Sequence, residues 1–198
     1  MLLTHRFNFL KIASIILIFG FLSSCIVHYP SDIRGIYSYY RVTEKEHPNF
    51  IQRPESNLCE KESEEPFIIY RIRANELKAC LVKSTKSIVY FWSPNCSAPV
   101  CIPPNYAQEY SSRRNVDLLI IATYYDYEKM NYDYNLDRPL FGIDTEYYRS
   151  NLTSRYLDRF KTDLIGKEAF EENKIGRFYL FESDSLVMVS SSIEELGI

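Results

Sequence analysis

The sequence predicts an α/β domain in which a mixed β-sheet is flanked by helices, and three observations support this fold class. The unbroken apolar run 87–92 is typical of a strand buried on both faces, and the largely apolar stretch 116–122 predicts a second buried strand. A helix over 104–112, which begins with a proline, supplies the crossover that parallel neighbours require. Near the C-terminus, the apolar stretches 178–181 and 186–189 flank a short polar turn and predict an antiparallel hairpin.

The first elements of this domain follow from residue type and spacing. The stretch 67–72 is rich in β-branched and aromatic residues, so it predicts a strand. Asn75 is expected to cap a short helix that places Leu77, Cys80 and Leu81 on one face.

The remaining elements complete the sheet and its cover. A short strand is expected over 139–143 and a last short helix over 192–196. The stretch 33–42 is apolar enough to predict a further strand on the domain edge. A helix is predicted by residues that recur every fourth position, namely Tyr148, Leu152, Tyr156 and Phe160.

Residues 1–24 have the build of a secretory signal. Arg6 and Lys11 precede an uncharged apolar run, 12–22, which is shorter than the roughly 18 residues that span a bilayer. Leu-Ser-Ser and Cys25 then resemble the bacterial lipobox, in which a cysteine receives lipid before cleavage. The resemblance implies a lipoprotein held on a membrane of the bacterial cell envelope, facing the periplasm. The alternative is an uncleaved anchor with an incidental cysteine.

The chain after the signal divides into two parts. Residues 25–66 contain several prolines and a charge run, 59–65, so we interpret them as a lipidated N-terminus and tether. Residues 67–198 are expected to form the folded domain. No internal repeat is present in the sequence.

Composition excludes several classes of function. The 198 residues carry a net charge of −3, without the basic excess of a nucleic-acid-binding protein. Two of the three histidines, His28 and His47, fall in the tether, and His5 falls in the signal, which argues against a histidine triad. Zinc binding is not expected because the chain has no Cys-x-x-Cys pair, and no cofactor motif is found. The sequence leaves the oligomeric state open.

Four cysteines remain beyond Cys25, and an exported protein resides where disulfides persist. Cys96 and Cys101 are five positions apart, a spacing that a helix would stretch to about 7.5 Å along its axis. Because the intervening and following prolines oppose a helix, these residues can form a loop short enough for a disulfide. A structural disulfide, a redox-active pair and unpaired thiols all remain open for them. Cys80 is expected to be a buried thiol, with a bond to Cys59 as the alternative.

The stretch 88–96, Ile-Val-Tyr-Phe-Trp-Ser-Pro-Asn-Cys, is similar to the strand and active-site entry of the thioredoxin superfamily. It most resembles the envelope thiol–disulfide lipoproteins, in which an apolar strand and Phe-Trp precede the first cysteine. The resemblance covers about residues 67–198. It implies that Cys96 attacks as a thiolate and Cys101 resolves the mixed disulfide, with exported cysteine-containing proteins as partners.

The sequence departs from this family at two places. Pro99 stands where the second cysteine is expected, and the helix begins only at 104, beyond the range over which its dipole would stabilise a Cys96 thiolate. Gly176 stands where the family usually has a cis-proline that faces the thiols. By resemblance, Trp92 and Gly176 are expected at the substrate edge. The alternative function is a redox-inactive binding or structural module with the same fold.

The tyrosine-rich connection 124–134 has two interpretations. Its tyrosines could form a platform for a peptide or glycan, or they could cover the edge of the sheet, which we favour. Asp126 follows the second buried strand on the same sheet edge as Cys96, where it is a candidate proton acceptor.

Overall fold

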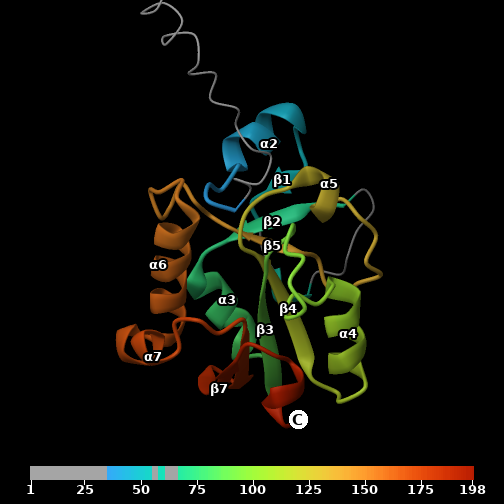
Figure 1. Cartoon of the computed structure of the whole chain (residues 1–198), viewed down its shortest axis with the longest axis vertical. Coiled ribbons are helices and arrows are strands. Elements are labelled where there is room, and N and C mark those ends of the chain that lie inside the picture. The colour runs from blue at the N-terminus through green and yellow to red at the C-terminus, as the bar shows by residue number, and fades with distance from the viewer. Residues whose placement is uncertain (1–34, 55–57, 61–66) are drawn as a thin grey trace, which may run out of the picture. The chain divides into compact units, whose positions relative to one another are not determined.

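A computed structural model of the chain describes residues 35–54, 58–60 and 67–198 (Figure 1). These residues belong to a compact unit that extends from Arg34 to Ile198. The predicted signal peptide and its lipidation site, Cys25, lie outside the described residues. Within the described ranges, no helix combines the length and the apolar character that a bilayer crossing needs.

The described part of the chain contains one mixed sheet of seven strands. The strands are β1 (Ile51–Gln52), β2 (Ile69–Ile72), β3 (Lys86–Trp92), β4 (Asp117–Ala122), β5 (Phe141–Ile143), β6 (Phe178–Glu182) and β7 (Ser185–Ser190). Their order in the sheet is β1-β2-β5-β4-β3-β6-β7. The neighbouring strands β1, β2, β5, β4 and β3 are parallel to one another. Strand β6 is antiparallel to both β3 and β7. The predicted α/β class with a mixed sheet is therefore confirmed.

Helices cover both faces of this sheet. They are α2 (Tyr40–Glu46), α3 (Ala74–Leu81), α4 (Pro104–Ser112), α5 (Tyr127–Met130), α6 (Thr153–Ile165), α7 (Lys167–Glu172) and the 3-10 helices η2 (Leu58–Glu60) and η3 (Glu194–Leu196). In Figure 1, α3 and α6 lie on one side of the central strands and α4 lies on the other. Two hydrophobic clusters fill the space between the sheet and these two layers.

Alternation along β3 shows why its apolar run is unbroken. Ile88, Tyr90 and Trp92 point into the cluster that includes Ala107 of α4. Val89 and Phe91 point into the opposite cluster, with residues of α3 and α6. Since successive side chains of a strand face opposite sides, a strand covered on both faces is apolar at both alternating sets of positions, here from Ile88 to Trp92. The prediction of a doubly buried strand is confirmed.

Two predicted helices differ from the structure at their first turn. Helix α3 starts at Ala74, with Asn75 inside it, because the Glu76 carboxylate accepts the N–H of Arg73 at 2.7 Å. Helix α6 starts at Thr153, so Tyr148 precedes it. The helix α4 and the terminal hairpin have the predicted positions, whereas α7 was not predicted.

The predicted edge strand over 33–42 is wrong. Tyr40 begins α2, and the strand-like contact within the described part of this stretch is an isolated bridge between Tyr37 and Leu152. The ring of Tyr40 is buried and packs edge-to-face on Tyr125, with ring centroids 5.4 Å apart. This tertiary contact determines the conformation of the segment, because it outweighs the local propensity for a strand.

The folded unit begins earlier than the expected boundary at residue 67. The edge strand of the sheet is β1, which pairs in parallel with β2, and Ile69 N–H donates to Phe50 C=O at 2.8 Å. Phe50 and Ile51 are buried in the hydrophobic core. Residues that we interpreted as tether therefore complete the sheet.

Candidate functional site

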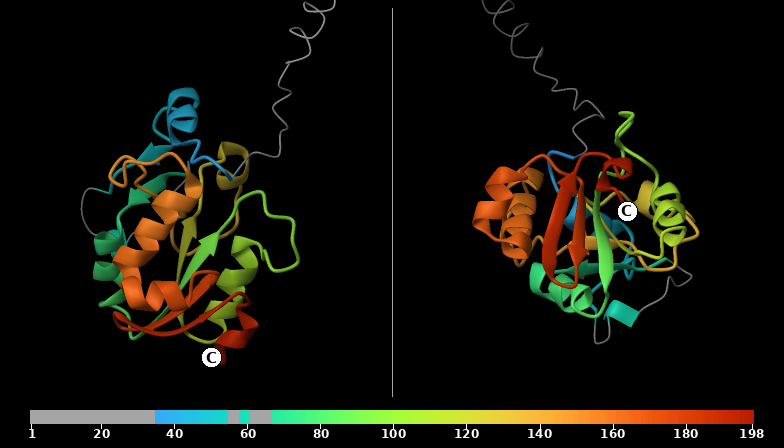
Figure 2. Two further views of the ribbon diagram at one scale, coloured as in Figure 1. Left: turned by 60° about the vertical axis from the view of Figure 1, so that its left-hand side comes forward. Right: turned by 90° about the horizontal axis from the view of Figure 1, so that it is seen from below.

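The two loop cysteines form a disulfide at the end of β3. Cys96 and Cys101 are bonded, with Cα atoms 5.8 Å apart, and both residues are half-buried. The segment between β3 and α4 contains neither helix nor strand, and it projects from the body of the molecule in both views of Figure 2. The predicted loop closure is confirmed. Whether the pair is redox-active stays a prediction.

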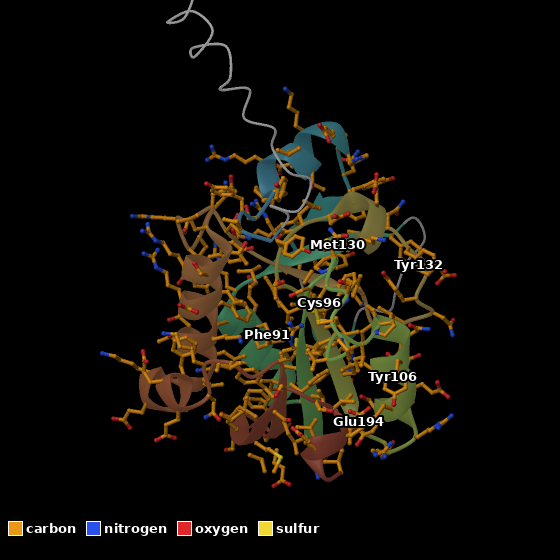
Figure 3. The ribbon with its side chains drawn as sticks, in the orientation of Figure 1. Phe91, Cys96, Tyr106, Met130, Tyr132 and Glu194 are labelled. Carbon is orange, nitrogen blue, oxygen red and sulfur yellow. A yellow bond between two sulfur atoms is a disulfide. The ribbon has the colours of Figure 1, made fainter. Side chains whose placement is uncertain are left out.

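The loop starts at the carboxyl edge of the parallel strands, and its two ends are anchored. Trp92 and Ala122, the last residues of β3 and β4, are register partners. Asn95 N–H donates to the Tyr124 hydroxyl at 2.8 Å, and the Tyr90 hydroxyl donates to Ile102 C=O at 2.7 Å. Burial raises the pKa of Tyr90 above its ordinary value, although Arg177 partly opposes this, so the phenol remains a donor. In Figure 3, Cys96 is seen near the middle of the view, in front of the central strands.

Asp126 supports this loop. The Asn95 side-chain amide donates to the Asp126 carboxylate, which also accepts the N–H of Lys129 at 3.2 Å and so caps α5. The Asp126 residue is 8% exposed. Asp126 thus lies on the predicted edge and holds the residue that precedes Cys96. Its role as a proton acceptor for Cys96 stays a prediction.

A groove of about 280 Å³ adjoins the disulfide. Its lining combines Cys96 with the ends of β3 and β4 and the start of α6, and its other members are Gly35, Ser93, Asn95, Thr123, Tyr124, Thr153 and Leu157. Hydroxyl and amide groups are frequent in this lining.

The segment before β6 passes beside Cys96, where the resemblance places a substrate edge. Arg177 Nη2 lies 3.8 Å from Cys96 Sγ. The backbone of Gly176 is already engaged, because its N–H donates to Asn173 C=O at 3.2 Å and its C=O accepts from Lys161 Nζ at 2.9 Å. The Gly176 N–H is therefore unavailable to a substrate, and its C=O is already paired once.

Packing explains the residue type at position 176. A Cβ added to Gly176 would lie 1.9 Å from Cγ1 of Val189 on β7, so Val189 would have to move. The glycine is thus required by the close approach of β7, and a proline ring would meet the same obstacle.

Trp92, the other residue expected at the substrate edge, is buried. Its side chain packs edge-to-face on Tyr134, with ring centroids 5.5 Å apart, and the residue is 4% exposed. Trp92 forms the base from which the cysteine loop departs and presents no face to a substrate.

Two cations near the disulfide were not identified from the sequence, namely Lys161 on α6 and Arg177. Lys161 is 5% exposed, and burial together with repulsion from Arg177 lowers its pKa to about 8, against an opposing effect of Asp158. The sequence feature that could have identified Lys161 is its spacing from the apolar residues of the helix. Lys161 follows Leu157 by four positions and precedes Leu164 by three, on the apolar stripe of the helix.

The second disulfide joins Cys59 of η2 to Cys80 of α3, with Cα atoms 4.9 Å apart. Cys80 is buried, as predicted from its helix face, but it is bonded to Cys59. The bond therefore attaches part of the predicted tether to the domain.

The tyrosine-rich connection mainly covers the edge of the sheet. Tyr125 is buried, and Tyr127 stacks on His47 with ring centroids 3.3 Å apart. Tyr132 is the exception, at 63% exposed. The interpretation as edge cover is confirmed for most of these side chains.

Comparisons with protein-family models, curated proteins and solved structures find no match to this chain. Among the residues that the structure describes, no group of three or more His, Cys, Asp or Glu side chains is placed to hold a metal ion. The geometry around Cys96 is therefore the basis for assigning a function.

Proposed function

We propose that this chain is a membrane-anchored lipoprotein whose thioredoxin-like domain exchanges disulfides with exported proteins through Cys96 and Cys101. The observation that carries the proposal is a half-buried disulfide in an anchored loop beside a groove. The sheet also supports it, because the cysteine loop follows β3, which lies between the parallel β4 and the antiparallel β6.

The exchange consists of two displacements at sulfur. In the reduced protein, the Cys96 thiolate attacks one sulfur of a substrate disulfide, the substrate S–S bond breaks, and the other substrate sulfur leaves as a thiolate. The Cys101 thiolate then attacks Cys96 Sγ in the mixed disulfide and releases the second substrate sulfur. Two electrons pass to the substrate, whose two thiolates take up protons, and the Cys96–Cys101 bond forms. A dithiol protein restores the reduced pair by the same steps in reverse.

The structure favours Cys96 as the attacking residue. Cys96 lines the groove, whereas Cys101 is not among the groove residues. A substrate in the groove would reach Cys96 Sγ first, and Cys101 would remain behind it to resolve the mixed disulfide.

Trapping of mixed disulfides tests the exchange. The full-length Cys101→Ser variant, mixed with a bacterial envelope extract, should retain proteins that dithiothreitol releases, because the resolving thiol is missing. The Cys96→Ser variant should retain none. Cys80→Ser is the matched control, since it frees Cys59 away from the groove and reports non-specific thiol capture.

Equal capture by Cys101→Ser and Cys80→Ser would contradict the proposal, as would the absence of capture by Cys101→Ser. Either result would favour the alternative, a redox-inactive binding module in which Cys96–Cys101 only closes the loop.

Lipid attachment is tested separately. Cells that express the wild-type chain should incorporate labelled palmitate into it, and Cys25→Ala should leave the protein unprocessed and unlabelled, because the acceptor thiol is lost. Labelling that persists in Cys25→Ala would show that the N-terminal signal has another role.

A further inference from the structure

The guanidinium beside the disulfide has an unusual set of contacts. Arg177 Nη2 is 3.8 Å from Cys96 Sγ, while its Nη1 is buried and has no hydrogen-bond partner among the described residues. None of the ion pairs found in the described ranges includes Arg177. A cation that is partly desolvated and lacks an anionic partner is unfavourable unless an anion forms nearby.

The main chain at Arg177 is anchored on both sides. Arg177 N–H donates to Ser190 C=O and Arg177 C=O accepts from Phe91 N–H, both at 2.9 Å, so the residue is fixed between β7 and β3. The preceding Gly176 is fixed by Lys161 Nζ at 2.9 Å. The sheet and α6 therefore fix the backbone from which the Arg177 side chain extends toward Cys96.

The two redox states of Cys96 differ in what they offer to Arg177. A disulfide sulfur is neutral and accepts hydrogen bonds weakly, whereas a thiolate carries a full negative charge. The usual alternative source of stabilisation, a helix N-terminus, is absent at Cys96 because α4 begins only at Pro104. Arg177 thus interacts more strongly with the reduced pair than with the oxidised pair.

We propose that Arg177 stabilises the Cys96 thiolate, which makes the Cys96–Cys101 disulfide easier to reduce and Cys96 a better nucleophile at neutral pH. This inference extends the proposed function by naming the residue that sets its redox balance. Other titratable or charged groups around the site are Lys161 and Asp158 from α6, Tyr179 from β6, Tyr90 from β3 and Asp126, which is bonded to Asn95.

Equilibration with glutathione measures this effect. Two molecules of reduced glutathione convert the disulfide into two thiols and become one molecule of oxidised glutathione. In the full chain with Cys25→Ser, at a pH above the Cys96 thiol pKa of both proteins, Arg177→Met should lower the equilibrium constant for reduction about tenfold, equivalent to about 30 mV, because the thiolate loses its neighbouring cation. Arg177→Lys should retain most of the wild-type value. Arg113→Met, which removes an exposed guanidinium from the end of α4, is the matched control and should change nothing.

Alkylation provides a second readout. With Cys25→Ser and Cys101→Ser, Cys96 is the free thiol, and the pH midpoint of its reaction with iodoacetamide reports thiolate formation. Adding Arg177→Met should move this midpoint upward by about one pH unit. Far-UV circular dichroism and an intact Cys59–Cys80 bond verify folding, and Arg177→Gln, which keeps a polar side chain, serves if the methionine variant does not fold.

An unchanged redox equilibrium and an unchanged midpoint in a folded Arg177 variant would overturn the inference. If Cys101→Ser nevertheless trapped exported proteins, the proposed exchange would stand without it. Conversely, a shift caused by Arg177→Met with no trapped protein would support the inference and contradict the proposed exchange.

Discussion

Lys161 is a buried ammonium that is held by one carbonyl and two aromatic rings. Its Nζ donates to Gly176 C=O and lies 4.7 Å and 5.1 Å from the ring centroids of Phe91 and Tyr179. These contacts offset only part of the desolvation, and repulsion from Arg177 adds to it, so its pKa falls to about 8. We infer that Lys161 is tolerated because it positions the Gly176–Arg177 segment against Cys96.

Stability should depend on pH through Lys161. Its folded pKa of about 8 lies below its ordinary value of 10.5, so between these values the unfolded chain binds more protons. The free energy of unfolding should therefore rise with pH in this window, by about 2 kcal/mol from pH 7.5 to 9.5 relative to Lys161→Met. Urea unfolding at both pH values measures the difference. The exposed Lys167→Met should behave as wild type, and parallel profiles for wild type and Lys161→Met would refute the assignment.

At the scale of elements, the Cys59–Cys80 bond connects the short helix η2 to α3, and β2 lies between these two helices in the sequence. Just after α3, Lys83 Nζ also pairs with Glu60 of η2 at 3.1 Å, but both side chains are exposed and contribute little. The covalent bond acts together with the buried Leu58 side chain and the hydrogen bond from Arg138 to Cys59 C=O, which also attach this segment to the domain.

Removal of this disulfide should lower stability more than removal of the loop disulfide. Cys59 and Cys80 are 21 positions apart, against five for Cys96 and Cys101. Chain entropy predicts a loss of about 3 kcal/mol in the unfolding free energy for the Cys59→Ser, Cys80→Ser double variant. It predicts about 2 kcal/mol for the Cys96→Ser, Cys101→Ser control. Urea unfolding at pH 7 provides both values, and a larger loss in the control would contradict the model.

At the scale of the whole molecule, residues before 67 are part of the core. The strand β1 protects one edge of the sheet, and α2 contributes a buried tyrosine, Tyr40. Phe50 and Ile51 pack in the same cluster as residues of β3 and β4. An unprotected edge strand is a known route to aggregation, so this N-terminal segment protects the sheet as well as stabilising it.

Truncation should reveal this contribution. A fragment of residues 34–198 with Cys59→Ser and Cys80→Ser should unfold cooperatively on heating. A fragment of residues 67–198 with Cys80→Ser should be several kcal/mol less stable or aggregate, because four buried hydrophobic side chains are lost, namely Tyr40, Phe50, Ile51 and Leu58. Both fragments lack the second disulfide, so thermal unfolding monitored by circular dichroism isolates the role of α2 and β1. Equal melting temperatures would instead support a domain boundary at residue 67.

Several parts of the fold and the site follow from the sequence because their causes are local. The alternation-free run before Cys96 identifies β3, and the prolines between Cys96 and Pro104 delay α4 and allow the disulfide to close. These features depend on side-chain type and backbone stereochemistry over a few residues. The lipid anchor and the redox chemistry remain predictions from resemblance.

Only the tertiary structure decided which distant residues meet. Contacts of Tyr40 place the end of the predicted strand 33–42 in the helix α2. The tertiary structure also pairs Cys59 with Cys80. It also placed Arg177 against Cys96, 81 positions away. No periodicity encodes such meetings, because they depend on the strand order and on how closely β7 approaches the segment before β6. Local stereochemistry therefore predicts the loop that carries the disulfide, and the assembled sheet determines the charge beside it.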